Sequence, residues 1–241
     1  MITFKQFIRE NELRDDLDDD TIALSALLKG PCKKYLRQSQ GNGLLFRGMD
    51  SYGELYGFLD IPVTDENGEP TDKKLKYYKK VVRKDRKPMS TTLGVHKIID
   101  NWFEEEMGMK ARSEAMFCYG ESGRMHAAGY ARLWPSVVFP IGKFVYCWSP
   151  KVKDLYDIIV NTFEDGNDLR ARFVGSDGKP DVEAIANEMN DLGYTINNFD
   201  KAVSASCEIM IECEEYFVVP YYSDEDLINI KQAYREAFKS L

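Results

Sequence analysis

Residues 208–219 read EIMIECEEYFVV, and this stretch decides the class of fold that the sequence predicts. Glu208 is followed by three apolar residues, then by a short acidic turn, and then by the apolar run of residues 216–219. Short runs rich in isoleucine, valine and aromatic residues are typical of β-strands. The stretch therefore predicts two consecutive strands, with a glutamate as the first residue of the first one.

The rest of the chain mixes further strands with helices. Apolar runs predict strands near residues 44–46, 116–119, 137–139 and 143–148. Apolar periodicity, capping residues and turn residues predict helices over residues 21–28, 50–59, 95–107, 152–163, 181–192 and 223–241. Because strands and helices do not alternate regularly, we expect an α+β fold with a mixed or antiparallel sheet and peripheral helices.

Composition narrows the classes of function. The chain has 241 residues, 44% of them hydrophobic, and a formal net charge of -8, which favours a globular protein and argues against a general nucleic-acid binder. Its five cysteines have no paired spacing, and its two histidines, His96 and His126, lie far apart, so we expect reduced thiols and no metal site. Neither an apolar run of about 20 residues nor a secretory signal is present, so no membrane partner is expected.

Three polar signatures follow one another along the chain. The first is Arg47-Gly48 at the end of an apolar run, the second is Ser90-Thr91 before a predicted helix, and the third is Glu208. An arginine presents a planar fork of donors to a diphosphate or a carboxylate, and a glycine lets the backbone approach a ligand closely. Hydroxyl groups can orient a ribose or a carboxylate, and they also cap helices.

This order of residue types resembles the Arg-Ser-Glu signature of mono-ADP-ribosyltransferases, which use NAD as donor. The resemblance implies a split-sheet core, with NAD as co-substrate, no metal, and a host protein or nucleic acid as acceptor. Arg47 and Gly48 would bind NAD, and Ser90 and Thr91 would orient the nicotinamide ribose and the glutamate. Glu208 would stabilise the oxocarbenium-like state that forms as the nicotinamide–ribose bond breaks.

Two departures from the family pattern leave alternatives open. The gap between Ser90 and Glu208 is much longer than usual, so we expect an insertion around residues 120–200, and Ser149 is a second candidate serine. Glu214, in the pair Glu212-x-Glu214, is a second candidate glutamate. In the family a Glu-x-Glu pair goes with arginine as acceptor, so the acceptor stays open.

The N-terminal sequence MITFKQFIRE is a separate signature. It resembles the capsid-targeting leader of internal head proteins in large contractile-tailed phages. That resemblance implies cleavage after Glu10, a single domain over residues 11–241, packaging with the phage genome in the virion interior, and later release into the host cytoplasm. A packed amphipathic helix with Phe4, Phe7 and Ile8 on one face is the alternative. A non-catalytic virion or internal head protein is the alternative function.

Two basic groupings are also open to more than one interpretation. Nine of the fifteen residues from Lys73 to Lys87 are lysine or arginine, with Tyr77 and Tyr78 among them. This stretch could bind a phosphate backbone or an acidic partner, recruit the acceptor or the NAD phosphates, or form a solvated helix face. Arg112, in the run Arg112-Ser113-Glu114, could lie in a cleft or form an ion pair across the fold.

Overall fold

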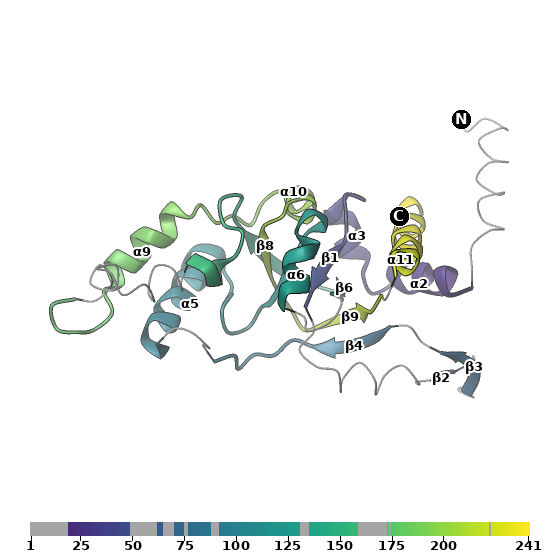
Figure 1. The fold of residues 1–241 in the computed structure, drawn as a ribbon, viewed down its shortest axis with the longest axis horizontal. Coiled ribbons are helices and arrows are strands. Elements are labelled where there is room, and N and C mark those ends of the chain that lie inside the picture. The colour runs from purple at the N-terminus through teal and green to yellow at the C-terminus, as the bar shows by residue number, and fades with distance from the viewer. Residues whose placement is uncertain are drawn as a thin grey trace.

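A central antiparallel sheet dominates the computed structural model, which describes residues 19–48, 62–64, 70–74, 77–87, 92–130, 135–158, 173, 175–221 and 223–241. Among these residues seven strands pair in the order β4-β9-β6-β1-β5-β8-β7, and a two-stranded ribbon, β2-β3, stands apart from them (Figure 1). The strands are β1 (Leu45–Arg47), β2 (Pro62–Thr64), β3 (Pro70–Lys74), β4 (Tyr78–Val81), β5 (Met116–Tyr119), β6 (Ser136–Pro140), β7 (Phe144–Trp148), β8 (Glu208–Cys213) and β9 (Glu215–Val219). The predicted α+β class with an antiparallel sheet is confirmed.

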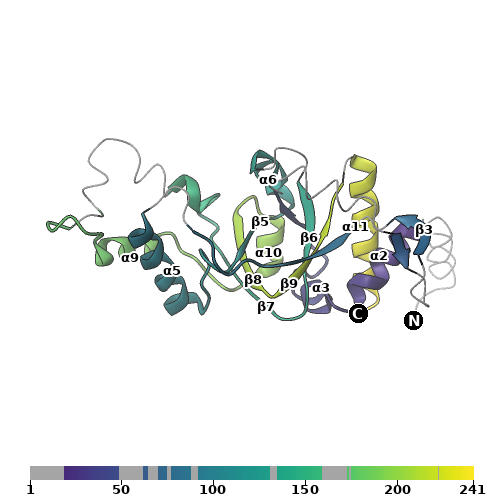
Figure 2. The ribbon, with the colours of Figure 1, turned by 90° about the horizontal axis from the view of Figure 1, so that it is seen from below.

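Helices lie at both ends of the sheet. In both views α5 and α9 occupy one end of the molecule, and α2 and α11 lie side by side toward the other (Figures 1 and 2). The helices are α2 (Asp19–Lys29), α3 (Lys33–Ser39), α5 (Leu93–Met107), α6 (Arg124–Tyr130), α9 (Val182–Asp191), α10 (Phe199–Ser204) and α11 (Asp224–Lys239), with a 3₁₀ turn at Glu121–Gly123. None of the helices in the described ranges is long and apolar enough to cross a membrane.

Side-chain caps fix where three of these helices begin. The side chain of Thr92 accepts a hydrogen bond from the backbone N–H of Val95 at the start of α5. The side chain of Asp181 accepts one from the backbone N–H of Ala184 at the start of α9. Ser223 and Asp226 form a reciprocal capping box at the start of α11. These caps satisfy backbone N–H groups that have no partner inside the helix, so the local sequence sets the helix starts.

The sheet consists of two parts joined at one place. Within the described ranges β1 and β5 pair at a single position, Phe46 with Tyr119. On one side of this junction β1 pairs with β6 over three positions, and on the other β5 pairs with β8 over four. The sheet is therefore continuous in its hydrogen bonding but narrow between β1 and β5.

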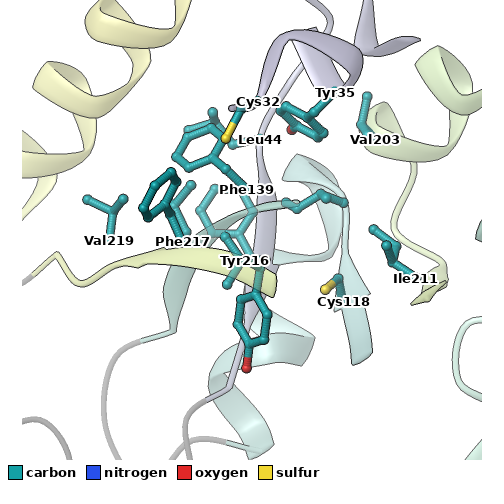
Figure 3. Close-up of a cluster of buried hydrophobic side chains, with 14 of the residues drawn as sticks. Cys32, Tyr35, Leu44, Cys118, Phe139, Val203, Ile211, Tyr216, Phe217 and Val219 are labelled. Carbon is teal, nitrogen blue, oxygen red and sulfur yellow. The ribbon is translucent and has the colours of Figure 1, made fainter. Parts of the chain in front are cut away.

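Two apolar clusters cover the strands. The larger cluster joins the sheet to α2, α3, α10 and α11, and Figure 3 shows part of it, with Tyr35 and Val203 above Ile211, and with Phe217 and Tyr216 on opposite sides of β9. The smaller cluster lies between β5, β7, β8 and the helices α5 and α9. Side chains along β8 alternate between them: Ile209 and Ile211 belong to the larger cluster, and Met210 to the smaller one.

All five cysteines are free thiols buried in these clusters. Burial raises the pKa of Cys32, Cys118 and Cys213 to about 12, with smaller contributions from neighbouring groups. Burial also raises the pKa of Cys147 and Cys207. The cysteines therefore act as small core residues, in agreement with the expectation of reduced thiols.

The described elements correct several expectations. The helices α3, α6 and α10 and the strand β4 are not predicted by the sequence patterns, and within the range 152–163 only residues 155–158 are described as helical. The predicted helix over residues 50–59 lies outside the described residues. Residues 120–200, where an insertion is expected, include β6 and β7, which are strands of the seven-stranded sheet.

A close backbone contact at Gly120, directly after β5, provides a test of this packing. A Cβ at this position would lie 2.4 Å from the carbonyl oxygen of Val203 and 2.6 Å from that of Ala205. We therefore expect Gly120→Ala to lower the free energy of unfolding by about 1–3 kcal/mol, as overpacking does. Urea denaturation of both proteins measures the difference.

Gly129→Ala in α6 is the matched control. Among the described residues nothing lies within 4 Å of a Cβ at Gly129, and alanine favours a helix over glycine by up to about 1 kcal/mol. This control is expected to be neutral or slightly stabilising. Equal effects of the two substitutions would contradict the close approach at Gly120.

Candidate functional site

The sequence-predicted site residues occupy two strands of the sheet. Arg47 is the last residue of β1, Gly48 follows it, and Glu208 is the first residue of β8. Ser90, Thr91 and the N-terminal ten residues lie outside the described part of the chain. The described neighbour of the serine motif, Thr92, serves as the cap of α5.

Glu208 is buried beside a second carboxylate. Its side chain is 6% exposed, and its Oε2 accepts a hydrogen bond of 3.2 Å from the backbone N–H of Leu155. Its own backbone N–H donates to the carbonyl of Lys153, at 2.8 Å. Asp154, between these two residues, is 7% exposed and accepts a 2.6 Å hydrogen bond from the hydroxyl of Tyr119. The turn at residues 153–155 thus brings two carboxyl groups together at the head of β8.

This environment changes the protonation of Glu208. Burial is the largest cause and the carboxylate of Asp154 the next, and together they raise the pKa of Glu208 from 4.5 to about 8. The guanidinium groups of Arg112 and Arg86 and the N–H of Leu155 act in the opposite direction. Glu208 therefore holds a proton over much of the neutral pH range.

Three arginines converge on Phe117 of β5. Nη1 of Arg47 donates a 2.9 Å hydrogen bond to the carbonyl oxygen of Phe117, at the narrow junction between β1 and β5. The guanidinium carbons of Arg86 and Arg112 lie 4.7 Å and 5.6 Å from the centre of the Phe117 ring, within the range of cation–π contacts. Residues 47, 86, 112 and 117 are called the arginine cluster below.

Backbone bonds hold two members of the arginine cluster in place. Asp100 of α5 accepts hydrogen bonds from the backbone of Arg112, at 2.9 Å, and from the backbone and the hydroxyl of Ser113. The N–H of Arg86 donates to the carbonyl of Ser113, at 3.4 Å. The carboxylate of Asp100 is thus occupied in fixing the 112–113 backbone.

Arg47 and Glu208 are near each other in the sheet but not in contact. Phe46, Tyr119 and Glu208 are lateral neighbours on three adjacent strands, and Arg47 is one residue further along β1. Because successive residues of a strand point to opposite faces, the side chains of Arg47 and Glu208 leave the sheet on opposite sides. Arg86 and Arg112, which lie over the ring of Phe117, both lower the pKa of Glu208.

The alternative serine and glutamate have different surroundings. Ser149 is completely buried, and its hydroxyl donates to the carbonyl of Leu192 and accepts from the N–H of Lys151. This hydroxyl therefore stabilises the turn after β7. Glu214 is exposed in the turn between β8 and β9, where its carbonyl accepts a hydrogen bond from Val82.

Sequence reasoning did not select three residues that the structure places at the site. Asp154 carried no motif, Arg86 was only part of the basic stretch, and Arg112 was left open between a position in a cleft and an ion pair across the fold. Neither arginine forms an ion pair within the described ranges, whereas Lys79 of the same basic stretch pairs with Glu215 at 2.8 Å. The solvated-helix interpretation of the stretch is wrong for β4, because Tyr78–Val81 pairs with β9.

Neither a metal-binding group among the described residues nor a known relative indicates a function for this site. Among the described residues no group of three histidine, cysteine or acidic side chains could hold a metal ion. Comparison with protein-family models, with curated proteins and with solved structures finds no match to this chain. The case for a function therefore depends on the residues themselves.

The raised pKa of Glu208 predicts a specific dependence of stability on pH. The folded protein keeps a proton on Glu208 that the unfolded chain releases between pH 4.5 and about 8, so this group's contribution to stability falls as the pH rises through that range. Glu208→Gln imitates the protonated form and removes the effect. We expect the variant to gain stability relative to the wild type from pH 5 to pH 8, with no further change above about pH 9.

Urea denaturation of both proteins across this pH series makes the measurement. If the difference between them does not change with pH, then Glu208 is ionised in the folded protein and its carboxyl group is not in the environment described above.

Proposed function

We propose that the protein is an NAD-dependent mono-ADP-ribosyltransferase that modifies a host macromolecule. The observation that carries the proposal is a buried carboxyl group, Glu208, at the head of a central strand, where the guanidinium groups of Arg112 and Arg86 act on its charge. The resemblance to the Arg-Ser-Glu signature also supports it. The described strands form one seven-stranded sheet rather than the split sheet expected of the family, and the single-position pairing of β1 with β5 is its narrowest place.

The residues present fit NAD in their chemistry. Guanidinium groups bind diphosphates through paired hydrogen bonds, and the hydroxyl of Tyr194 and Nε of Arg112 are buried without a hydrogen-bond partner in the described structure. NAD supplies an ADP-ribosyl group joined to a good leaving group, nicotinamide. Arg47 and Gly48 would bind the diphosphate and ribose, and Ser90 and Thr91 would orient the nicotinamide ribose.

Glu208 would act on the positive charge that develops on the ribose. A carboxylate does this only when it is ionised, and the raised pKa of Glu208 means that ionisation must accompany substrate binding or a rise in pH. The positive charge of the nicotinamide ring favours the ionised form of a nearby carboxyl group. Tyr119 holds the neighbouring Asp154 in position through a hydrogen bond of 2.6 Å.

The proposed biological setting depends on the N-terminal sequence. The resemblance of residues 1–10 to a capsid-targeting leader supports a place in the phage virion interior, followed by release into the host cytoplasm. The acceptor would then be a host protein or nucleic acid that the enzyme meets after infection.

Label transfer from NAD tests the proposed activity. The purified chain is incubated with NAD labelled in its adenylate part and with host lysate, and transfer is followed on a gel. We expect labelled bands with the wild type, and a loss of at least about a hundredfold in rate with Glu208→Gln, because an amide cannot stabilise the developing charge as a carboxylate does. Arg47→Ala is expected to lose transfer through weaker NAD binding.

Glu214→Gln tells the two candidate glutamates apart. Retained transfer in Glu208→Gln with loss in Glu214→Gln would move the role to Glu214. NAD binding is measured separately: at 100 times its dissociation constant NAD should stabilise the protein by about 2.7 kcal/mol. No label in any lane together with no stabilisation by NAD would reject the proposed function.

A further inference from the structure

The arginine cluster carries positive charge that no described carboxylate neutralises. Arg47, Arg86 and Arg112 come from three separate segments of the chain, and none of them forms an ion pair within the described ranges. Of the acidic groups nearest to them, Asp100 is occupied by backbone N–H groups, and Glu208 favours its protonated form. The three guanidinium groups therefore have no direct carboxylate partner within the described ranges, in a chain whose overall charge is -8.

Keeping these groups together has an electrostatic cost. Burial, and next the charge of Arg47, lower the pKa of Arg86 to about 10, so its charged form is disfavoured relative to a guanidinium in water. The group still carries its charge at neutral pH. A bound anion would remove the repulsion between the arginines and supply hydrogen-bond acceptors for their donors.

Polar atoms without partners lie around Arg112. Its own Nε, the hydroxyl of Tyr194 and Nδ1 of His96 are buried and make no hydrogen bond in the described structure. Tyr194 is 8% exposed and His96 is 5% exposed. Arg112 is close enough to both to change their pKa values: it lowers that of His96 and counteracts the rise that burial causes in that of Tyr194. Buried polar groups in native proteins normally have a partner, so these three atoms are available to hydrogen-bond a polar ligand or a water molecule.

We propose that Arg47, Arg86 and Arg112 form a binding site for a diphosphate group. A diphosphate has more acceptor oxygens than a single phosphate and spreads them over a longer span, so that each of three guanidinium groups from separate segments can pair with it. Arg86 and Arg112 both lie over the ring of Phe117, and the hydrogen bonds to Asp100 and Ser113 fix the backbone of this part of the site before the ligand arrives.

This inference rests on the proposed function only for the natural ligand, since NAD contains a diphosphate. It differs from the sequence-based assignment of Arg47, Gly48, Ser90 and Thr91 to NAD, because it gives Arg86 and Arg112 parts equal to that of Arg47. The site itself can be tested with inorganic pyrophosphate, which contains neither nicotinamide nor ribose.

Titration calorimetry of the full chain with inorganic pyrophosphate is the experiment. We expect binding by the wild type, and a dissociation constant at least about tenfold higher for both Arg86→Gln and Arg112→Gln, because each loses charge-assisted hydrogen bonds. Orthophosphate should bind more weakly than pyrophosphate to the wild type. Arg83→Gln is the matched control: Arg83 is three residues from Arg86, 72% exposed and next to Asp85, so pyrophosphate binding should stay within about twofold.

Several outcomes overturn the inference. These are no binding of pyrophosphate by the wild type, equal binding by Arg86→Gln and Arg83→Gln, and equal affinities for pyrophosphate and orthophosphate. Thermal unfolding without ligand shows whether each variant is folded. If Arg112→Gln is not, Arg86→Gln and the charge-preserving Arg86→Lys decide the question, with Arg86→Lys expected to bind between the wild type and Arg86→Gln because it keeps the charge and loses the fork.

The two proposals fail in different ways. Glu208→Gln should bind pyrophosphate like the wild type while losing transfer of the label. Pyrophosphate binding without any transfer by the wild type would reject the proposed function and leave the diphosphate site in place. Transfer that persists when pyrophosphate does not bind would reject the diphosphate site alone.

Discussion

The single pairing of Phe46 with Tyr119 is the constraint on which the arrangement of the candidate site depends. If β1 and β5 continued to pair beyond it, the carbonyl of Phe117 would be available to a backbone N–H of β1. Instead Arg47 donates to that carbonyl from its side chain. The same junction sets Tyr119 beside Glu208, so both the arginine cluster and the carboxyl pair are positioned from β5. Gly120 follows β5 directly, and the backbone carbonyl groups of Val203 and Ala205 leave no room for a side chain at this position.

The site combines opposite electrostatic costs. On one side, burial and the neighbouring Asp154 disfavour a negative charge on Glu208. On the other, burial and Arg47 disfavour the positive charge of Arg86. The groups do not cancel each other through direct ion pairs, although the arginines lower the pKa of Glu208 to some extent. Groups held in this way, with perturbed protonation and without direct partners, are more frequent at functional sites than elsewhere in proteins.

Much of the fold could be predicted because its signals are local. The strand at residues 208–213 is an isoleucine-rich apolar run, and α11 begins with the serine cap and acidic first turn that the sequence shows. The helices α3 and α10 are short, seven and six residues, and their stability comes from packing of Tyr35 and Phe199 rather than from a periodic pattern. The strand β4 consists of a tyrosine, two lysines and a valine, and only its pairing with β9 makes it a strand.

Fewer residues of the candidate site could be predicted, because the roles of several of them depend on contacts with distant parts of the chain. Arg47 and Glu208 could be selected because each ends or begins an apolar run. Arg86, Arg112 and Asp154 acquire their importance from distant neighbours: Phe117 brings the two arginines together, and the turn at residues 153–155 brings Asp154 to Glu208. Such proximity follows from the order of strands in the sheet, which no single segment encodes.

The burial of the five thiols has a consequence for the chemistry of the folded chain. With pKa values raised to about 12 at three of the five positions, and raised at the other two, the folded protein contains very little thiolate, the form that attacks disulfides and electrophiles. A chain with these thiols can pass between reducing and oxidising surroundings without cross-linking, provided that it stays folded. The low reactivity expected of these thiols thus comes from their packing, and it ends wherever the core opens.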